Sequence, residues 1–174
     1  MLSAYLRLMA RRPLATQIVS AGVIGVAGDA VCQLAIERKP LKQYDYGRGA
    51  RFFIMPAFWM APILNRWFRV LEMIGGKGAI FKRLAVDQIL FSPCFGASIL
   101  MVLGIMEGAT PQQAFDSMKK IIWDIYVTSL QFWPAVQLIN LNFVPLNYRV
   151  VFVQLASLIW NSYISYKTQN KTLQ

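Results

Sequence analysis

Residues 125–148 read IYVTSLQFWPAVQLINLNFVPLNY, which is 24 consecutive residues without a charged side chain. After Arg149, a further 17 uncharged residues extend from Val150 to Tyr166. A helix that crosses a bilayer needs roughly 20 mostly apolar residues, because about 30 Å of hydrocarbon is crossed at about 1.5 Å per residue. Both runs also contain Asn and Gln, whose amides are costly against lipid and should face other helices or a wet cavity. This region predicts a polytopic membrane protein with a polar interior.

The composition of the whole chain agrees with a membrane protein. Of the 174 residues, 56% are hydrophobic and 15% are charged, well under the roughly 25% charged residues of a soluble domain. The formal net charge of +10 comes from 18 Lys and Arg against 8 Asp and Glu. The basic residues cluster at the ends of apolar segments, where they anchor helices to lipid headgroups. We therefore expect the lipid bilayer as partner, allow for a homo-oligomer, and expect no nucleic-acid binding.

The distribution of apolar residues predicts an all-α fold, a transmembrane helical bundle with four or five membrane segments in one domain covering residues 1–174. A basic amphipathic helix, Met1 to Arg12, precedes them at the membrane interface and also suits a mitochondrial import signal. An amphipathic ramp over 111–124, opened by a capping box at Thr110, leads into the fourth segment. The apolar segments are 14–36, 49–71, 84–106, 125–143 and 148–166.

Small residues and prolines should shape these segments. Ala21, Gly25 and Gly28 form a stripe on the first segment that lets another helix approach closely. Pro93 and Pro134 should kink the third and fourth segments, because proline lacks the N–H of a helical hydrogen bond. Lys and Arg divide nine to nine between the two sides of a five-span arrangement, so charge assigns no orientation.

Nothing in the sequence predicts an enzyme. The chain has no His, the commonest general base near neutral pH and the commonest metal ligand. We expect no catalytic, cofactor-binding or metal-binding residues. The two cysteines, Cys32 and Cys94, both lie within apolar segments. They are either buried thiols or a redox-controlled pair that forms a disulfide between segments.

Polar residues inside apolar segments are the remaining chemical signal. Asp29 lies deep in the first segment, Asp87 opens the third, and Gln137 and Asn140 share one face of the fourth. A central Asp costs about 2.5–3.5 kcal/mol on insertion scales, so it should face the interior and find partners. These side chains either line a path for water, ions or small solutes, or form buried pairs between helices. The candidate set is Asp29, Gln33, Arg48, Arg51, Asp87, Gln88, Gln137, Asn140 and Arg149.

The stretch from Trp133 to Arg149, WPAVQLINLNFVPLNYR, followed by Trp160-Asn161-Ser162-Tyr163, resembles the signature of a known family. This is the family of small peroxisomal membrane proteins that includes the mitochondrial inner-membrane protein Mpv-seventeen. The resemblance covers Tyr5 to Lys167. Shorter matches are Gly28-Asp29 with Gln33, Asp45-x-x-Arg48-x-x-Arg51, Pro62 with Trp67-Phe68-x-x-Leu71, and Asp87-Gln88 with Pro93-Cys94-Phe95.

The resemblance implies a multi-span helical protein proposed to form a channel, linked to mitochondrial homeostasis and mitochondrial DNA maintenance. The stretches around 87–95 and 132–165 look closest to the Mpv-seventeen branch, which implies the mitochondrial inner membrane, with the peroxisomal membrane as alternative. The family often has Gly-Pro and a His before Trp67, where this chain has Ala61-Pro62 and Asn65. We expect a weakly selective small-solute channel or channel-like protein. The alternative is a non-conducting structural or assembly component of inner-membrane complexes.

Overall fold

A computed structural model describes residues 2–172 of the chain, and the side chains of residues 3–160. The structure is 86% helical, and no strand occurs in the described range, so the predicted all-α class is confirmed. The chain forms two compact units. The first combines Met1–Arg66 with Pro145–Gln174, and the second is Trp67–Val144.

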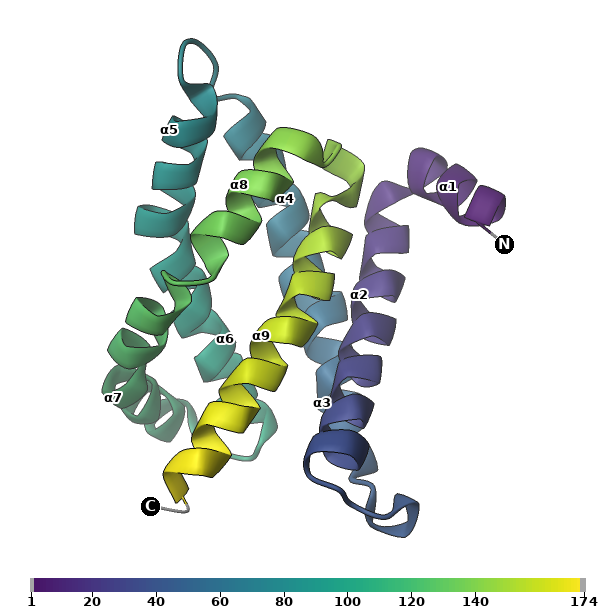
Figure 1. Cartoon of the computed structure of the whole chain (residues 1–174), viewed down its shortest axis with the longest axis vertical. Helices are drawn as coiled ribbons and strands as arrows, with labels where there is room; N and C mark the ends of the chain where they lie inside the picture. Colours follow the sequence, from purple (N-terminus) through teal and green to yellow (C-terminus); the bar gives the residue numbers. More distant parts are fainter. Residues whose placement is uncertain (1, 173–174) are drawn as a thin grey trace. The chain divides into compact units, whose positions relative to one another are not determined.

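The first unit is built around a long apolar helix, α2 (Pro13–Val31), which continues as a π-helical turn over Cys32–Ile36. Helix α2 packs against α1, α3 and α9 (Figure 1). The elements of this unit are α1 (Leu2–Arg11), α2, the 3-10 turn Leu41–Gln43, α3 (Tyr46–Ile54), the π-helical segment Met55–Met60, the start of α4 (Ala61–Glu72), the 3-10 turn Leu146–Tyr148 and α9 (Arg149–Thr172).

The small-residue stripe on α2 is the surface against which α3 and α9 approach, as predicted. A methyl group at Gly25 would overlap the carbonyl oxygen of Phe52 in α3, and one at Gly28 would overlap the side chain of Leu158 in α9. Pro56 has no N–H, so it cannot bond the Phe52 carbonyl in an α-helical register. That carbonyl instead lies against the Gly25 backbone, at a distance that only glycine permits.

The second unit contains the end of α4, α5 (Ala79–Val86), the π-helical turn Asp87–Phe91, α6 (Ser92–Met106), α7 (Pro111–Ser129) and α8 (Trp133–Phe143). Within it α6 packs against α7, and α5 against α8. The predicted capping box opens α7: the Thr110 hydroxyl accepts from the Gln113 N–H, and the Gln113 side chain accepts from the Thr110 N–H. Close packing of Gly104 on Ala114 brings α6 and α7 together.

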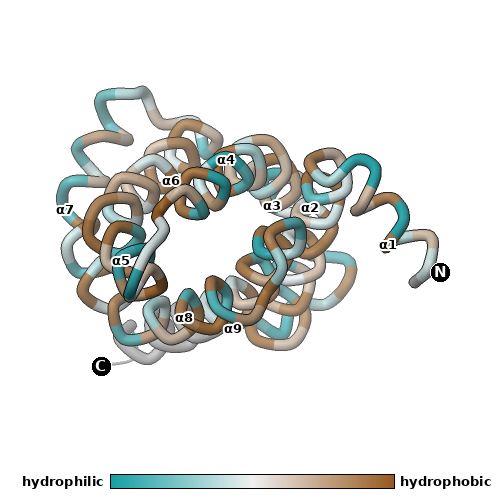
Figure 2. The backbone as a smooth tube through the Cα atoms, turned by 90° about the horizontal axis from the view of Figure 1, so that it is seen from above, coloured by the Kyte–Doolittle hydropathy of each residue, from teal (hydrophilic) through white to brown (hydrophobic). Residues whose placement is uncertain are grey.

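Two helical stretches are long and apolar enough to cross a membrane by length and composition. They are Pro13–Ile36, with mean hydropathy 1.7, and Ala79–Met106, with mean hydropathy 2.2. They contain the predicted segments 14–36 and 84–106. The predicted segment 49–71 lies in a continuous helical stretch, residues 46–72, which carries arginines toward both ends. Along α1, hydrophilic and hydrophobic residues alternate (Figure 2), and its place at the interface stays a prediction.

The fourth apolar segment is not the single helix that we expected over 125–143. Helix α7 ends at Ser129, a turn follows, and α8 begins at Trp133. Pro134 has no N–H for the carbonyl four residues earlier, so it starts a helix here rather than kinking one. The hydroxyls of Thr128 and Ser129 bond to carbonyls of Asp124 and Tyr126 in the last turn of α7. At 11 residues, α8 is about 16 Å long, too short to cross the hydrocarbon alone.

Candidate functional site

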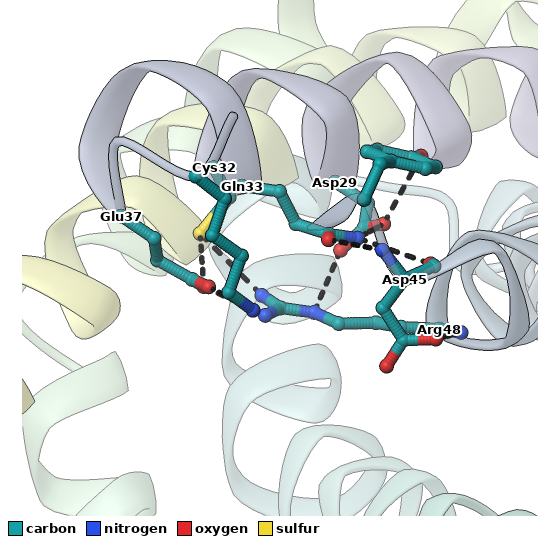
Figure 3. Close-up of polar contacts among 8 residues, drawn as sticks. Asp29, Cys32, Gln33, Glu37, Asp45 and Arg48 are labelled. Atoms are coloured by element: carbon teal, nitrogen blue, oxygen red, sulfur yellow. Dashed lines mark hydrogen bonds and ion pairs between the residues drawn. The ribbon is translucent and has the colours of Figure 1, made fainter. Parts of the chain in front are cut away.

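The first unit holds a polar cluster centred on Arg48, which we call the Arg48 cluster (Figure 3). Its local sequence explains how the residues meet. Asp29, near the end of α2, and Gln33, in the π-helical turn that follows, are both buried and lie four residues apart. Asp45 is the N-cap of α3, and its carboxylate accepts from the Arg48 N–H at 2.8 Å. The cluster consists of Asp29, Cys32, Gln33, Glu37, Tyr44, Asp45 and Arg48.

The guanidinium of Arg48 lies between two carboxylates. Its Nε is 2.7 Å from Asp29 Oδ1, and one terminal nitrogen is 2.6 Å from Glu37 Oε1. The Asp29 contact is an ion pair by distance, without the alignment of a hydrogen bond. Glu37 also pairs with Lys39 Nζ at 2.8 Å. The other terminal nitrogen of Arg48 is 3.5 Å from Cys32 Sγ. Arg48 thus joins α2, its π-helical end and α3 electrostatically.

Gln33 and Tyr44 complete the surroundings of Asp29. Gln33 Nε2 donates to Asp29 Oδ2 at 2.8 Å, and the Tyr44 hydroxyl lies 3.4 Å from the same oxygen. The Gln33 amide oxygen accepts from the Asp45 N–H at 2.8 Å. Asp29 is 1% exposed, so its charge is both buried and matched.

The residues of this cluster that lie beyond the apolar segments have shifted pKa values. Burial tends to raise the pKa of Glu37, but the hydrogen bonds and charges of Lys39 and Arg48 outweigh it and hold the pKa below the ordinary 4.5. The Arg48 backbone N–H likewise lowers the pKa of Asp45. Burial, together with the negative charge of Asp29, raises the pKa of Tyr44. At neutral pH Glu37 and Asp45 are therefore ionised beside the charged Arg48.

The second unit holds a different polar cluster, centred on Asp87. Three N–H groups converge on its carboxylate: Trp67 Nε1 donates to Oδ1 at 2.7 Å, and Gln88 Nε2 and Gln137 Nε2 donate to Oδ2 at 2.8 and 2.9 Å. Asn140 Nδ2 then donates to Gln137 Oε1 at 2.9 Å. We call these five residues the Asp87 cluster.

The backbone at this cluster follows from Pro93. In the π-helical turn Asp87–Phe91, the Ser92 N–H bonds to the Asp87 carbonyl, five residues back. The next bond in this register would come from residue 93, which has no N–H. The Tyr126 hydroxyl of α7 supplies the missing donor, at 3.0 Å from the Gln88 carbonyl. Such turns often occur at functional positions.

The surroundings of Asp87 are aromatic on one side. The Trp67 ring stacks on Phe91 at 4.2 Å between centroids, and Phe91 stacks on Phe95 at 4.9 Å. Two amide oxygens of the cluster, Gln88 Oε1 and Asn140 Oδ1, are buried without a hydrogen-bond donor.

In the part of the chain that the structure describes, no group of three or more His, Cys, Asp or Glu is placed to hold a metal ion.

The nine polar candidates thus separate by unit. Asp29, Gln33 and Arg48 meet in one cluster, while Asp87, Gln88, Gln137 and Asn140 meet in the other. Arg51 lies near the exposed Asp45 and acts on its charge, and Arg149 is buried at the start of α9.

Neither cysteine is in a disulfide: Cys32 belongs to the Arg48 cluster, whereas Cys94 is exposed. Burial of both thiols was one of the two expectations; Cys32 is half-buried, and for the exposed Cys94 the expectation is wrong. Its place on the surface of an apolar helix presents the thiol outward.

Several partners were not predicted from the sequence. Glu37, Tyr44 and Trp67 contact the candidates directly, and Trp67 stood out only as part of a motif. A third set of polar contacts lies in the first unit, where buried Gln17 donates to the Asn147 carbonyl and accepts from Asn65, both at 2.7 Å. Its members are 130 and 48 residues apart along the chain, so no local signal points to it.

Comparison of the amino-acid sequence with known proteins identifies its relatives. The profile of the Mpv17 / PMP22 family matches residues 104–165. The mitochondrial inner membrane protein Mpv17 of Caenorhabditis briggsae is 46% identical over 169 residues, covering 95% of this chain and 92% of that protein. The chain belongs to the Mpv17 / PMP22 family. The Mpv17 proteins of Danio rerio and Homo sapiens are each 34% identical over 167 residues, covering 94% of this chain and 94% and 95% of theirs.

These relatives also settle the compartment. Each bears the name of a mitochondrial inner membrane protein and aligns with most of the chain, so the chain is a protein of the mitochondrial inner membrane. No solved structure matches it.

Proposed function

We propose that this Mpv17-family protein crosses the inner membrane four or five times and conducts small solutes with weak selectivity. The observation that carries the proposal is the Asp87 cluster. A buried carboxylate on a helix long enough to cross the membrane has only neutral hydrogen-bond partners and adjoins buried amide oxygens without donors. A buried carboxylate and buried amide oxygens without donors are costly in a dry interior within the membrane. They suit the wall of a water-filled path.

Helix lengths support the number of spans. Besides the two stretches that are apolar enough to cross a membrane, residues 46–72 and α9 are each about 36 Å or longer at 1.5 Å per residue. The arginines of 46–72 would reach the headgroups by extending along the helix surface. A fifth crossing would need α7 and α8 together, which is a broken span of the kind that membrane proteins place beside protein or water.

Basic residues near Asp87 bear on the expected selectivity. Lys82 and Arg83 precede Asp87 by five and four residues, and positive charges there would oppose the acidic side chain. The Arg83 guanidinium is 3.1 Å from Glu72 Oε1 and also donates to the carbonyls of Glu72 and Ile74. Its charge is therefore largely compensated at the end of α4. We propose a preference for cations that is weak, because one carboxylate is a small part of a basic protein.

Conduction in planar bilayers tests the proposal. Under a salt gradient, purified Asp87→Asn should move the reversal potential toward zero, because it removes the negative potential. Gln137→Leu should lower the conductance, because it removes a hydrogen-bonding wall group. Asp116→Asn is the matched control, since the side chain of Asp116 on α7 is 47% exposed and pairs with a neighbouring lysine and glutamine. It should leave both quantities unchanged.

A second function has support from the other unit. Asp29 and its partners are fully engaged within the Arg48 cluster, as expected of groups that hold helices together. A protein built only of such contacts would be a non-conducting structural or assembly component of inner-membrane complexes. A well-folded wild-type protein that stays silent in bilayers across voltage and redox conditions would favour this alternative.

The family relationship extends the proposal to the cell. We infer a non-enzymatic role in mitochondrial homeostasis and in maintenance of mitochondrial DNA. Loss of the gene should lower the mitochondrial DNA copy number, and the wild-type chain should restore it. If conduction is the relevant activity, a stable Asp87→Asn protein should restore less than the Asp116→Asn control. Equal rescue by both would separate the cellular role from the Asp87 cluster.

A further inference from the structure

The stretch 37–46, which joins α2 to α3, carries the two most exposed large hydrophobic side chains among the described residues of the first unit. Leu41 is 75% exposed and Tyr46 is 77% exposed. Arg38 and Lys42 are exposed in the same stretch, and none of the ion pairs in the described range includes either of them. We call these four residues the loop surface. Apolar and cationic side chains exposed together indicate a surface that meets a partner.

The Arg48 cluster fixes the backbone that carries the loop surface (Figure 3). The Gln33 amide oxygen accepts from the Asp45 N–H at 2.8 Å, and Gln33 Nε2 donates to the Asp45 carbonyl at 3.2 Å. The Lys39 N–H donates to the Gln33 carbonyl at 3.0 Å. Between these points the chain forms the 3-10 turn Leu41–Gln43. Both ends of the loop are therefore bonded to the end of the first apolar helix.

The acids of this region are already engaged by other groups. Residues 37–51 contain five cations and two acids. Glu37 pairs with Lys39 and Arg48, and the Asp45 carboxylate accepts from the Arg48 N–H. The loop surface therefore keeps a positive charge that these acids do not neutralise.

The backbone at Arg38 indicates a role for its side chain outside the fold. Among the described residues other than glycine, Arg38 is the one with a positive φ, at 52°. It follows the last residue of the helical stretch and its cap, where helices commonly end with glycine because the left-handed conformation disfavours any side chain. Glycine would therefore serve the fold better than arginine at this position. A residue held in a disfavoured conformation motivates a functional hypothesis.

The length of the first apolar stretch sets the depth of the loop. Pro13–Ile36 has 24 residues, so it is about 36 Å long and covers about 30 Å of hydrocarbon. The loop begins directly after it, at the end of α2 opposite α1 (Figure 1). It therefore lies at the level of the lipid headgroups, where phosphate groups attract cations and where tyrosine is enriched.

We propose that the loop surface binds the headgroups of anionic phospholipids of the inner membrane. Arg38 and Lys42 contact lipid phosphates, while Leu41 enters the boundary between headgroups and acyl chains. The proposal rests on the proposed crossing of α2 but not on conduction. A silent protein that prefers anionic lipid would overturn conduction alone, and a conducting protein without this preference would overturn the lipid surface alone.

Native mass spectrometry of the purified full-length chain in detergent tests the preference for anionic lipid. The chain is titrated with cardiolipin, phosphatidylglycerol or phosphatidylcholine. We expect the two anionic lipids to bind more tightly. Arg38→Gln combined with Lys42→Gln should weaken their binding about 25-fold, because each basic residue near the surface contributes roughly a fivefold factor. Lys119→Gln combined with Lys120→Gln removes the same charge from α7 and should leave the affinity nearly unchanged.

Arg38→Gly separates the loss of a lipid contact from damage to the fold. In detergent without added lipid, it should raise the Tm by about 2–4 °C, because glycine accepts the positive φ. The same change should weaken binding of anionic lipid about fivefold. A protein that becomes more stable and binds lipid less tightly cannot owe the weaker binding to misfolding.

A fluorophore on Leu41→Cys, in a chain with Cys32→Ser and Cys94→Ser, measures the depth of the loop in vesicles that contain cardiolipin. Lipid with a nitroxide headgroup should quench it, and acrylamide in the water should not. Three results would overturn the proposal. Anionic and zwitterionic lipids bind with equal affinity. The two changes in the loop weaken binding no more than the two on α7, or Arg38→Gly keeps the full affinity. Acrylamide quenches the fluorophore freely, which would place the loop in water and assign its surface to a soluble protein.

Discussion

Replacement of Arg48 by Met should destabilise the protein mainly because it leaves the buried carboxylate of Asp29 without a charged partner. The substitution keeps a long apolar stem but removes the charge between Asp29 and Glu37. Glu37 is 18% exposed and retains Lys39 at 2.8 Å. The side chain of Asp29 is 0% exposed and retains only the neutral Gln33 and Tyr44. The cost therefore falls on the buried carboxylate of Asp29.

The expected magnitude follows from distance and burial. At 2.7 Å and an effective dielectric constant of 20, the attraction between Arg48 and Asp29 is about 6 kcal/mol before solvation is counted. Arg48 is 26% exposed, so returning its charge to water is only partly costly, and part of the attraction is offset. Breaking a buried pair by removing one partner costs about 3–5 kcal/mol. We expect a loss of about 3–4 kcal/mol in the free energy of unfolding.

Reversible unfolding in detergent, arranged as a double-mutant cycle, measures this loss. Asp29→Asn combined with Arg48→Met should be more stable than Arg48→Met alone, because no charge is left unmatched. Arg51→Met is the matched control. Arg51 acts on the exposed Asp45, so its removal should cost under about 1 kcal/mol. The reasoning would be refuted if Arg48→Met cost no more than Arg51→Met, or if the two changes at the Asp29–Arg48 pair were additive.

Three further predictions concern packing, pH and capping. Gly25→Ala should lower stability by about 1–3 kcal/mol or prevent folding, because its methyl group meets the Phe52 carbonyl, whereas Gly75→Ala, in open space, should be neutral by the same unfolding measurement. The lowered pKa of Glu37 stabilises the fold above its unfolded value near 4.5, and this contribution is lost as pH falls through the folded pKa. Glu37→Gln should flatten that part of the stability-against-pH curve, and an unchanged curve would contradict the assignment. Thr110→Ala should cost about 1 kcal/mol, measurable as a lower Tm, because the capping box is lost; an unchanged Tm would mean that α7 does not depend on its cap.

Features set by neighbours in the chain could be predicted from the sequence. The long apolar runs predicted helices long enough to cross the bilayer, and two of the predicted segments lie in such helices. The capping box at Thr110 and the small-residue stripe containing Gly25 were recognisable because both depend on spacing within one helix. The break between α7 and α8 was harder to predict. Pro134 is compatible with either a kink or a new helix, and the local sequence does not distinguish them.

The partner of each buried polar residue was decided only by the three-dimensional fold. Asp29 and Asp87 look alike in the sequence, each an acid within an apolar run and next to a polar amide or within one turn of it. The loop before α3 brings Arg48 to Asp29, while Asp87 meets Trp67 and Gln137, which are 20 and 50 residues away. Burial makes both acids depend on partners, but electrostatic and hydrogen-bond energies depend on distances across helices. Hydropathy and helical periodicity record which residues are buried, not what they meet, so an ion pair at one acid and an unbalanced charge at the other emerge only from packing.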